Sequence, residues 1–451
     1  MACALSTSYR WHTMHMATPV RRSGAVLTAT AALAAIGACT ADATASGWVV
    51  RAGLLDTTVS VVELVAPAQW PSQVAWLGEV EADFPVVGAP GLGVAASALD
   101  GVGVIIWSSI DSIQLGKQRR VGVRGDGPGE YRYIAFLGRC SDGELTAFDP
   151  ARLILSTYST STFEHVERRA PPLSRRGTVI GCQPSGALLS LLAPPTVEGY
   201  QPGLNRWPIH LAELASDGGV DSLASTPGSE WWFDPASDWI PTLTWRDETL
   251  GGVSAGGILV VQAASGEALL SRMPSGRSQR IDLRVGCQAA DASLLEAALQ
   301  RKLDEVRSPR DKQEFRAALN RAATAAPYSR RFIEVIGSAA TPGRFFVVAC
   351  HDATSNAVFA LSTRDALSVT AIGLIPIDAR VAGELDAGQI LVAQDREAGL
   401  RFGVIRYAVR PHRSSAPPFA RGTDEHGTKG SVVQRWHRHA SGTADHDFGF
   451  E

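Results

Sequence analysis

The sequence predicts an all-β protein: a six-bladed β-propeller with an aromatic-rich loop insertion and a helical-pair insertion. A turn glycine followed by three to five apolar residues recurs at Gly101, Gly143, Gly186, Gly257, Gly343 and Gly388. The spacings of 42, 43 and 45 residues fit one four-stranded propeller blade, and those of 71 and 86 fit the same period with insertions of roughly 30 and 40 residues. The 44 glycines against four methionines also favour a turn-rich β protein.

Composition limits the classes of partner. A hydrophobic share of 45% with 19% charged residues is typical of a folded chain with a sizeable core. The formal net charge is only -3, so no overall field attracts nucleic acid or an anionic membrane surface. We therefore expect no nucleic-acid partner.

The N-terminal region indicates export. Residues 1–39 contain paired arginines, Arg21 and Arg22, before an alanine-rich apolar run that is too short to span a bilayer. The run ends Ile-Gly-Ala-Cys at Cys39, which resembles the lipobox of bacterial lipoproteins. The resemblance implies a lipid-modified Cys39, a linker over residues 40–47 and an anchored domain at the cell envelope. A plain secretory signal with a chance cysteine is the alternative, and translation starts at either Met1 or Met16.

The propeller is expected to span residues 48–410. Because an open ring would leave two sheet edges unpaired, we expect the apolar segment 48–65 to pair with the last blade and close the ring. The strands expected to line the central axis are 93–98, 132–138, 178–181, 249–254, 332–337 and 380–384.

One turn carries a family resemblance. Arg124 is followed by Gly125, Asp126, Gly127, Pro128, Gly129, Glu130 and Tyr131. This stretch resembles the G-x-G-P-G-E-[FY] turn of NHL-repeat-like six-bladed β-propeller lipoproteins of bacterial envelopes, and residues 379–409 are similar to their last blade. The resemblance implies the fold and an envelope setting. It implies no catalytic residues, because that group shares no common reaction.

Two insertions interrupt the period. The first, at about residues 194–246, holds five of the eleven tryptophans: Trp207, Trp231, Trp232, Trp239 and Trp245. They form either a binding lip, because aromatic side chains give a large contact area at low entropic cost, or a local core that packs a long loop onto the ring.

The second insertion, at about residues 289–327, shows helical periodicity. Its first helix is expected to begin after Asp291, and its second near Pro309. These helices either cover one face of the propeller or bind a partner. The tail, 411–451, is polar and holds five of the ten histidines. We expect a disordered tail rather than a metal site, because nothing fixes the ligand geometry.

The sequence shows no catalytic constellation. The expected inner strands carry only two carboxylates, Glu334 and Glu384, too few for a calcium-dependent lactonase site. We therefore expect no metal, cofactor or catalytic residues. Cys140 and Cys182 occupy equivalent places in neighbouring units and form either a disulfide or two buried thiols.

The leading hypothesis is a non-enzymatic, lipid-anchored binding module for a protein, peptide or glycan of the cell envelope, with the membrane contacted through the anchor only. The alternative is a propeller hydrolase or lyase with its active site at the mouth of the channel.

Overall fold

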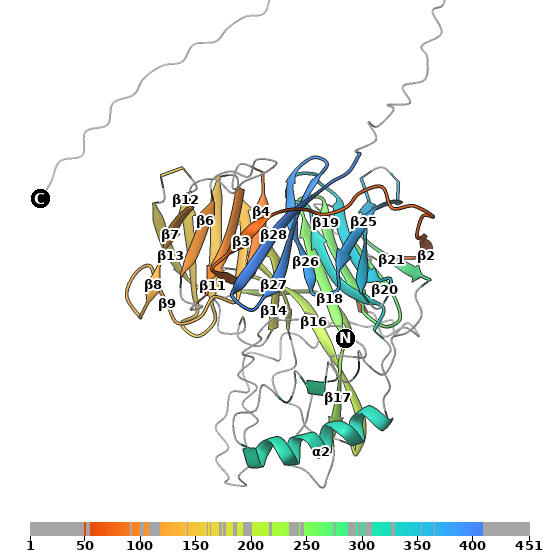
Figure 1. Cartoon of the computed structure of the whole chain (residues 1–451). Helices are drawn as coiled ribbons and strands as arrows, with labels where there is room; N and C mark the ends of the chain where they lie inside the picture. The colour runs from red at the N-terminus through yellow and green to blue at the C-terminus, as the bar shows by residue number, and fades with distance from the viewer. Residues whose placement is uncertain are drawn as a thin grey trace, which may run out of the picture. The chain divides into compact units, whose positions relative to one another are not determined.

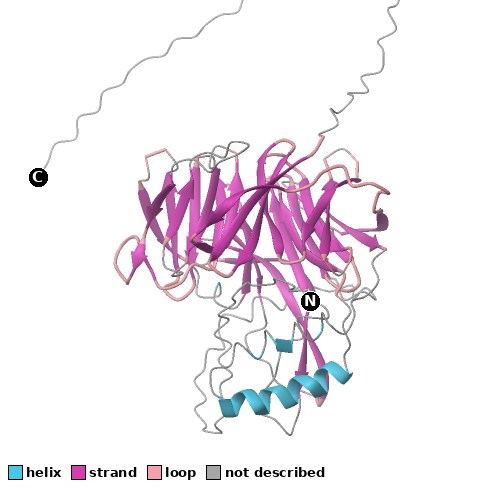
Figure 2. Ribbon diagram, viewed as in Figure 1, coloured by secondary structure: helices cyan, strands magenta, loops and turns pink. Residues whose placement is uncertain are grey.

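The structure, a computed structural model, describes residues between Val49 and Ala408 with internal gaps, the longest being 108–117, 193–200, 234–242 and 287–294. The predicted signal sequence with Cys39, the linker and the polar tail lie outside the described residues. Figures 1 and 2 show the described strands arranged as blades, with one long helix below them.

The described strands form six antiparallel blades in chain order, which confirms the predicted six-bladed propeller. The first three blades, each from the innermost strand outward, are β4 (Ala82–Ala89), β5 (Gly93–Ala98), β6 (Val104–Trp107) and β7 (Gln118–Val121); β10 (Phe136–Ser141), β11 (Glu144–Asp149), β12 (Ile154–Ser159) and β13 (His165–Arg169); β14 (Gly177–Cys182), β15 (Leu188–Leu192), β16 (Gly203–Leu214) and β17 (Val220–Phe233).

The other three blades are β18 (Thr249–Ser254), β19 (Gly257–Gln262), β20 (Glu267–Arg272) and β21 (Ser278–Val285); β22 (Phe332–Gly337), β23 (Arg344–Cys350), β24 (Ser355–Ser362) and β25 (Ser368–Pro376); β26 (Ala379–Asp386), β27 (Gln389–Arg396), β28 (Gly399–Arg406) and β3 (Ala75–Val80). Two short strands, β8 (Val123–Arg124) and β9 (Glu130–Tyr131), pair in parallel beside the second blade.

The blades form a closed ring with a core at every interface. Each inner strand contacts the inner strand of the next blade, and β26 contacts β4. Six hydrophobic clusters fill the six gaps between neighbouring blades. The middle strands of a blade are therefore covered on both faces, which explains why they are continuous apolar runs.

The ring is closed by a different strand from the one expected. Segment 48–65 does not pair with the last blade. Instead β1 (Val49–Val50) is antiparallel to β17, and β2 (Leu55–Leu64) is parallel to β21. The closing strand is β3, antiparallel to β28. Segment 48–65 therefore lies along the outer edges of the third and fourth blades. Its apolar residues are explained by this position, because an edge strand buries one of its faces.

The assignment of the first unit is also corrected. Its glycine, Gly101, lies between β5 and β6 rather than after the inner strand, and 93–98 is the second strand of the blade. The inner strand is β4, whose proline and mixed burial pattern made it less regular in sequence than its fully apolar neighbour. The turn glycines Gly143, Gly257, Gly343 and Gly388 do follow inner strands, as does Gly186, which comes between the inner strand β14 and β15 in the chain.

The inner strands of the fourth and fifth blades approach backbone to backbone. A Cβ atom on Gly337 would lie 1.8 Å from the carbonyl oxygen of Val253, and one on Gly252 would lie 2.8 Å from the amide nitrogen of Gly337. Only glycine fits at such a distance. This part of the ring is therefore tightly closed.

The two insertions share a second, smaller core, which we call the cap. Residues 194–246 are not a simple loop, because they contain β16 and β17, which are blade strands that continue past the ring as a long hairpin (Figure 1). Helix α2 (Pro309–Ala325) begins at the expected proline. The buried cap residues are Leu243, Leu299, Leu303, Phe315, Leu319 and Ala322, and Trp232 packs against them.

Only part of the first predicted helix falls within the described residues. Leu295, Leu299 and Leu303 are helical there, and Leu299 and Leu303 are buried in the cap. Apolar residues recur every three to four positions in this sequence. They lie on one side of each helix, and that side packs into the cap core.

Candidate functional site

The glycine-rich turn of the second blade uses its polar groups internally. Glu130 accepts a hydrogen bond from the amide of Gly127 at 2.6 Å, and Glu167 accepts one from the amide of Gly129 at 2.7 Å. Gly125 is also required sterically, because a Cβ atom there would lie 1.9 Å from Oε2 of Glu130. Pro128 is exposed in the same turn. The motif therefore holds a turn and offers little to a ligand.

Cys140 and Cys182 are joined by a disulfide whose Cα atoms are 5.2 Å apart. They lie on the inner strands β10 and β14, where neighbouring blades converge toward the axis, so equivalent positions come within bonding range. Cys350 is also disulfide-bonded, and Cys287 lies outside the described residues.

The five tryptophans of the first insertion are not gathered into one lip by the described residues. The Trp207 and Trp231 rings lie 6.2 Å apart on the β16–β17 hairpin. Trp232 packs against the cap core. Trp239 and Trp245 lie outside the described residues.

Glu384 is fully buried between the fifth and sixth blades. Its carboxylate accepts hydrogen bonds from Arg344 at 2.9 Å and from the Tyr407 hydroxyl at 2.5 Å, and a third from the Ser338 hydroxyl. Because all of these partners are protein groups and the side chain has no exposed surface, Glu384 joins two blades and does not face a ligand.

Glu334 is the inner-strand carboxylate with a different setting. Strand β22 has a β-bulge between Phe332 and Glu334, and bulges of this kind re-aim side chains. Arg330 supports the bulge by donating to the carbonyl oxygens of Phe332 at 3.1 Å and Ile333 at 2.9 Å. The Arg330 guanidinium also lies 3.1 Å from the carboxylate of Glu248.

Loss of water around Glu334 is the main influence on its carboxyl group. Desolvation raises the pKa of Glu334 to about 7, although the charges of Arg380 and Arg330 and a hydrogen bond from the amide of Val381 act in the opposite direction. Raised carboxyl pKa values occur preferentially at functional sites, but they also occur in structural clusters.

Arg380 is close enough for its charge to act on the Glu334 carboxylate, and Phe84 lies against Arg380. Arg380 is almost completely buried, and its guanidinium lies over the Phe84 ring at 4.6 Å from the centroid. Arg380 is near the start of β26 and Phe84 near the start of β4. The fifth, sixth and first blades each therefore contribute one side chain: Glu334, Arg380 and Phe84.

This group lies at the cap end of the ring. The inner strand β18 begins at Thr249, shortly after Leu243 of the cap core, and every blade runs in the same direction. The starts of all inner strands therefore face the cap. We call the set Glu248, Arg330, Glu334, Arg380 and Phe84 the mouth cluster. It combines two cations, two carboxylates and an aromatic ring across four adjacent blades.

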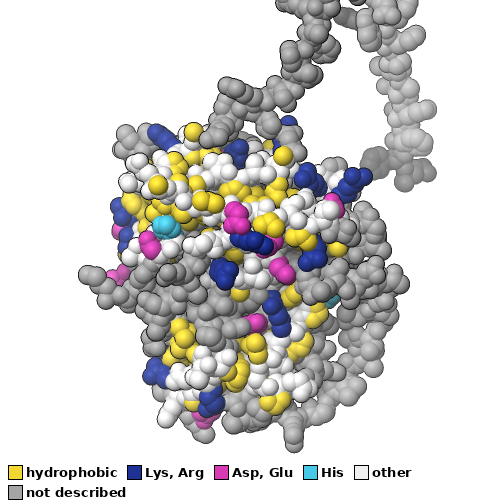
Figure 3. Space-filling view, turned by 90° about the vertical axis from the view of Figure 1, so that its right-hand side faces the viewer, with side chains coloured by type: hydrophobic (Ala, Val, Ile, Leu, Met, Phe, Trp, Pro, Cys, Tyr) yellow, Lys and Arg dark blue, Asp and Glu magenta, His cyan; other side chains and the backbone are white. Residues whose placement is uncertain are grey.

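On the outer wall, the side on which β2 lies has a pocket of about 250 Å³ whose charged lining residues, Glu267, Arg280 and Asp282, all come from the fourth blade. The side on which β2 lies faces the viewer in Figure 3, where hydrophobic side chains lie among charges of both signs. Val59 and Val61 are about half exposed there. Single exposed valines are common on soluble proteins and do not define a site.

Two absences apply to the described residues. No group of three or more His, Cys, Asp or Glu side chains among them is arranged to hold a metal ion. Nor does any helix in this part of the chain have the length and apolar character needed to span a bilayer.

No protein-family model matches the chain, and no curated protein matches it. A candidate exported protein from Bacteroides fragilis is 11% identical, with 78% of this chain and 100% of that chain covered and a TM-score of 0.42. A member of the DUF4221 family from Bacteroides vulgatus is 8% identical, with coverages of 75% and 96% and a TM-score of 0.42.

A luciferin-regenerating enzyme is 9% identical, with coverages of 75% and 97% and a TM-score of 0.38. All of these TM-scores are below 0.5. The assignment as a six-bladed β-propeller therefore rests on the strand pairing of this chain itself.

Proposed function

We propose that this protein is an exported, lipid-anchored β-propeller of the NHL-like kind that binds a protein, peptide or glycan of the cell envelope at the mouth cluster. The observation that carries the proposal is the convergence of Glu334, Arg380 and Phe84 from three blades at the cap end of the ring. Binding sites commonly combine an apolar surface with a few converging polar groups.

The chemistry of the cluster favours a polar ligand with an apolar or ring-shaped part. The Arg380 guanidinium has planar donors of the kind that recognise carboxylate or carbonyl oxygens, and Phe84 provides a flat apolar surface beside it. Glu334 accepts hydrogen bonds when ionised and donates one when protonated. Peptides and cell-wall glycans that carry lactyl or amino-acid substituents have this combination of groups.

The test is a binding titration of the purified mature protein with soluble cell-wall glycopeptides, envelope polysaccharides and a peptide library. Arg380→Lys keeps the charge but loses the planar guanidinium, so we expect binding at least about tenfold weaker. Glu334→Gln should weaken it as well. Glu79→Gln, on the exposed edge strand β3, is the matched control and should bind normally.

The proposal fails if a ligand binds and both mouth variants retain wild-type affinity. It also fails if none of these classes binds the wild-type protein. The anchor is tested separately by mass spectrometry of the mature N-terminus, where an unmodified Cys39 would remove lipid anchoring from the proposal.

A hydrolase or lyase is the second candidate, and Glu334 is the observation that favours it. A carboxyl group with a pKa of about 7 is suited to general acid–base catalysis at neutral pH. Turnover of glycosides, lactones or esters that is lost in Glu334→Gln, with binding retained, would favour an enzyme over a binding module. Glu384→Gln is unsuited to this test, because Glu384 is buried between blades.

A further inference from the structure

A concave site lies at the end of the ring away from the cap. It is a pocket of about 260 Å³ lined by Pro71, Ser72, Gln73, Ala75, Gln389, Val404 and Arg406. Strand β27 begins at Gln389, directly after the turn that ends β26, so this pocket and the mouth cluster lie at opposite ends of the sixth blade.

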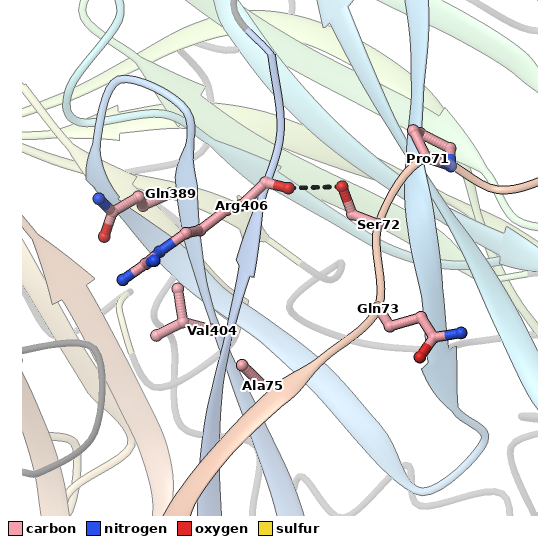
Figure 4. A pocket seen from close by; sticks show the side chains of 7 residues that line it. All are labelled: Pro71, Ser72, Gln73, Ala75, Gln389, Val404 and Arg406. Carbon is pink, nitrogen blue, oxygen red and sulfur yellow. Dashed lines mark hydrogen bonds between the residues drawn. The ribbon is translucent and has the colours of Figure 1, made fainter.

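The backbone around the pocket is fixed by the chain segment that leads into β3. The Ser72 hydroxyl donates a hydrogen bond to the carbonyl oxygen of Arg406 (Figure 4). Ser72 also forms an isolated bridge to Gly373, where a Cβ atom would lie only 2.7 Å from the carbonyl oxygen of Ser72. The segment is thereby held against the fifth and sixth blades, and one wall of the pocket is preformed.

Two polar side chains face the pocket together. Gln389 and Arg406 are direct partners across the antiparallel strands β27 and β28, so both project from the same face of the sheet. Figure 4 shows the two side chains extending to the same side, with Val404 and Ala75 below them and Gln73 turned away. Val404 is buried and gives the site an apolar floor.

The charge of the site is unbalanced. Arg406 is exposed, and no carboxylate is among the residues that line the pocket. A guanidinium recognises carboxylate, phosphate and sulfate oxygens through paired N–H donors. The Gln389 carboxamide adds one acceptor and two donors, which suit hydroxyl groups.

From these observations we infer that the pocket binds one acidic sugar residue, with the oxyanion on Arg406, hydroxyl groups on Gln389 and an apolar ring face over Val404. The volume is below the usual range for drug-sized ligands, which suits a single sugar unit. The inference does not rest on the proposed function, because it uses no residue of the mouth cluster.

The probes are glucuronate and galacturonate, with glucose as the neutral control, titrated into the purified mature protein by calorimetry or ligand-observed NMR. We expect dissociation constants for the two uronates on the order of 1 mM, and at least about tenfold weaker binding of glucose. Addition of about 0.5 M salt should weaken uronate binding, because the contact is between charges.

Arg406→Ala should abolish uronate binding, and Gln389→Ala should weaken it severalfold. Arg401→Ala is the matched control: Arg401 lies on the same strand, but its guanidinium stacks over Trp76. A circular dichroism spectrum verifies that each variant is folded, and Glu334→Gln should leave uronate binding unchanged.

Equal affinity for uronate and glucose, or unchanged uronate binding in Arg406→Ala, would overturn the inference. So would the absence of uronate binding at concentrations of about 10 mM. Binding of free phosphate as tightly as uronate would show an adventitious anion site and would also overturn the acidic-sugar assignment.

Discussion

Replacing Glu334 with glutamine should change how the stability of the protein depends on pH. The folded-state pKa is about 7, against an ordinary value of 4.5. Because the folded state holds this proton more tightly, the stabilisation from the protonated carboxyl is complete below pH 4.5 and is lost as the pH rises through 7. A pKa that is higher by this amount in the folded state corresponds to at most about 3 kcal/mol of stability.

Glu334 as a residue is only half-buried, so we expect about 2–3 kcal/mol. Glutamine keeps the shape and cannot ionise. The wild-type protein should therefore lose about 2–3 kcal/mol relative to Glu334→Gln between pH 4.5 and pH 8. Urea unfolding followed by tryptophan fluorescence at several pH values measures this difference, provided that each transition is two-state.

Subtracting the variant from the wild type cancels titration elsewhere in the chain. Glu79→Gln, on an exposed edge strand, serves as the control and should run parallel to the wild type. A difference independent of pH would refute the reasoning. A wild type that gains stability relative to Glu334→Gln with rising pH would show that Arg380 and Arg330 outweigh desolvation.

Three further changes test the packing of the ring. Replacing Cys140 and Cys182 with serine should lower the unfolding free energy by up to about 4 kcal/mol, because the crosslink spans 42 residues. Equal urea midpoints for the oxidised wild type and the double variant would contradict this. Gly337→Ala should lower the unfolding free energy by about 3 kcal/mol or more, because the added Cβ meets a carbonyl oxygen. Gly78→Ala is the control: its Cβ has open space, so the loss should be under about 0.5 kcal/mol. Similar thermal midpoints for the two variants would argue against close approach of the inner strands. Glu384→Gln should lower the unfolding free energy of the protein by about 3 kcal/mol, because Arg344 loses its buried counter-charge. An unchanged urea midpoint would show that Arg344 and Glu384 are not a coupled ion pair.

The periodic features of the fold could be predicted from the sequence. Glycine corners followed by buried middle strands recur because the middle strands of every blade are packed on both faces. Five of the six corner glycines come after the inner strand of their blade in the chain, and Gly101 is the exception. Helix α2 was predictable because Phe315, Leu319 and Ala322 recur on one side and Pro309 favours a first turn.

The pairing of the N-terminal strands was not predictable in this way. Segment 48–65 and β3 are both apolar and extended, and nothing local decides which blade edge each one joins. Contacts between residues far apart in the chain make that choice. The inner position of β4 was not predictable for the same reason. It is set by the contacts of β4 within the ring and not by the pattern of its own residues.

The candidate site shows the same limit more strongly. Glu334 was visible as a carboxylate on an expected inner strand. Arg380 and Phe84, however, lie in unremarkable sequence on different blades, and only ring closure brings them together. Glu384, like Glu334, is a carboxylate on an expected inner strand. Its register on β26, however, directs its side chain into the interface between two blades.

Hydrogen–deuterium exchange tests the mouth cluster most directly. The mature protein is compared with and without saturating soluble cell-wall glycopeptide. Our account predicts slower exchange at the first residues of β22, β26 and β4, and no change there in Arg380→Lys. Protection confined to the outer wall, or equal protection in the variant, would contradict the placement of the binding site at the mouth cluster.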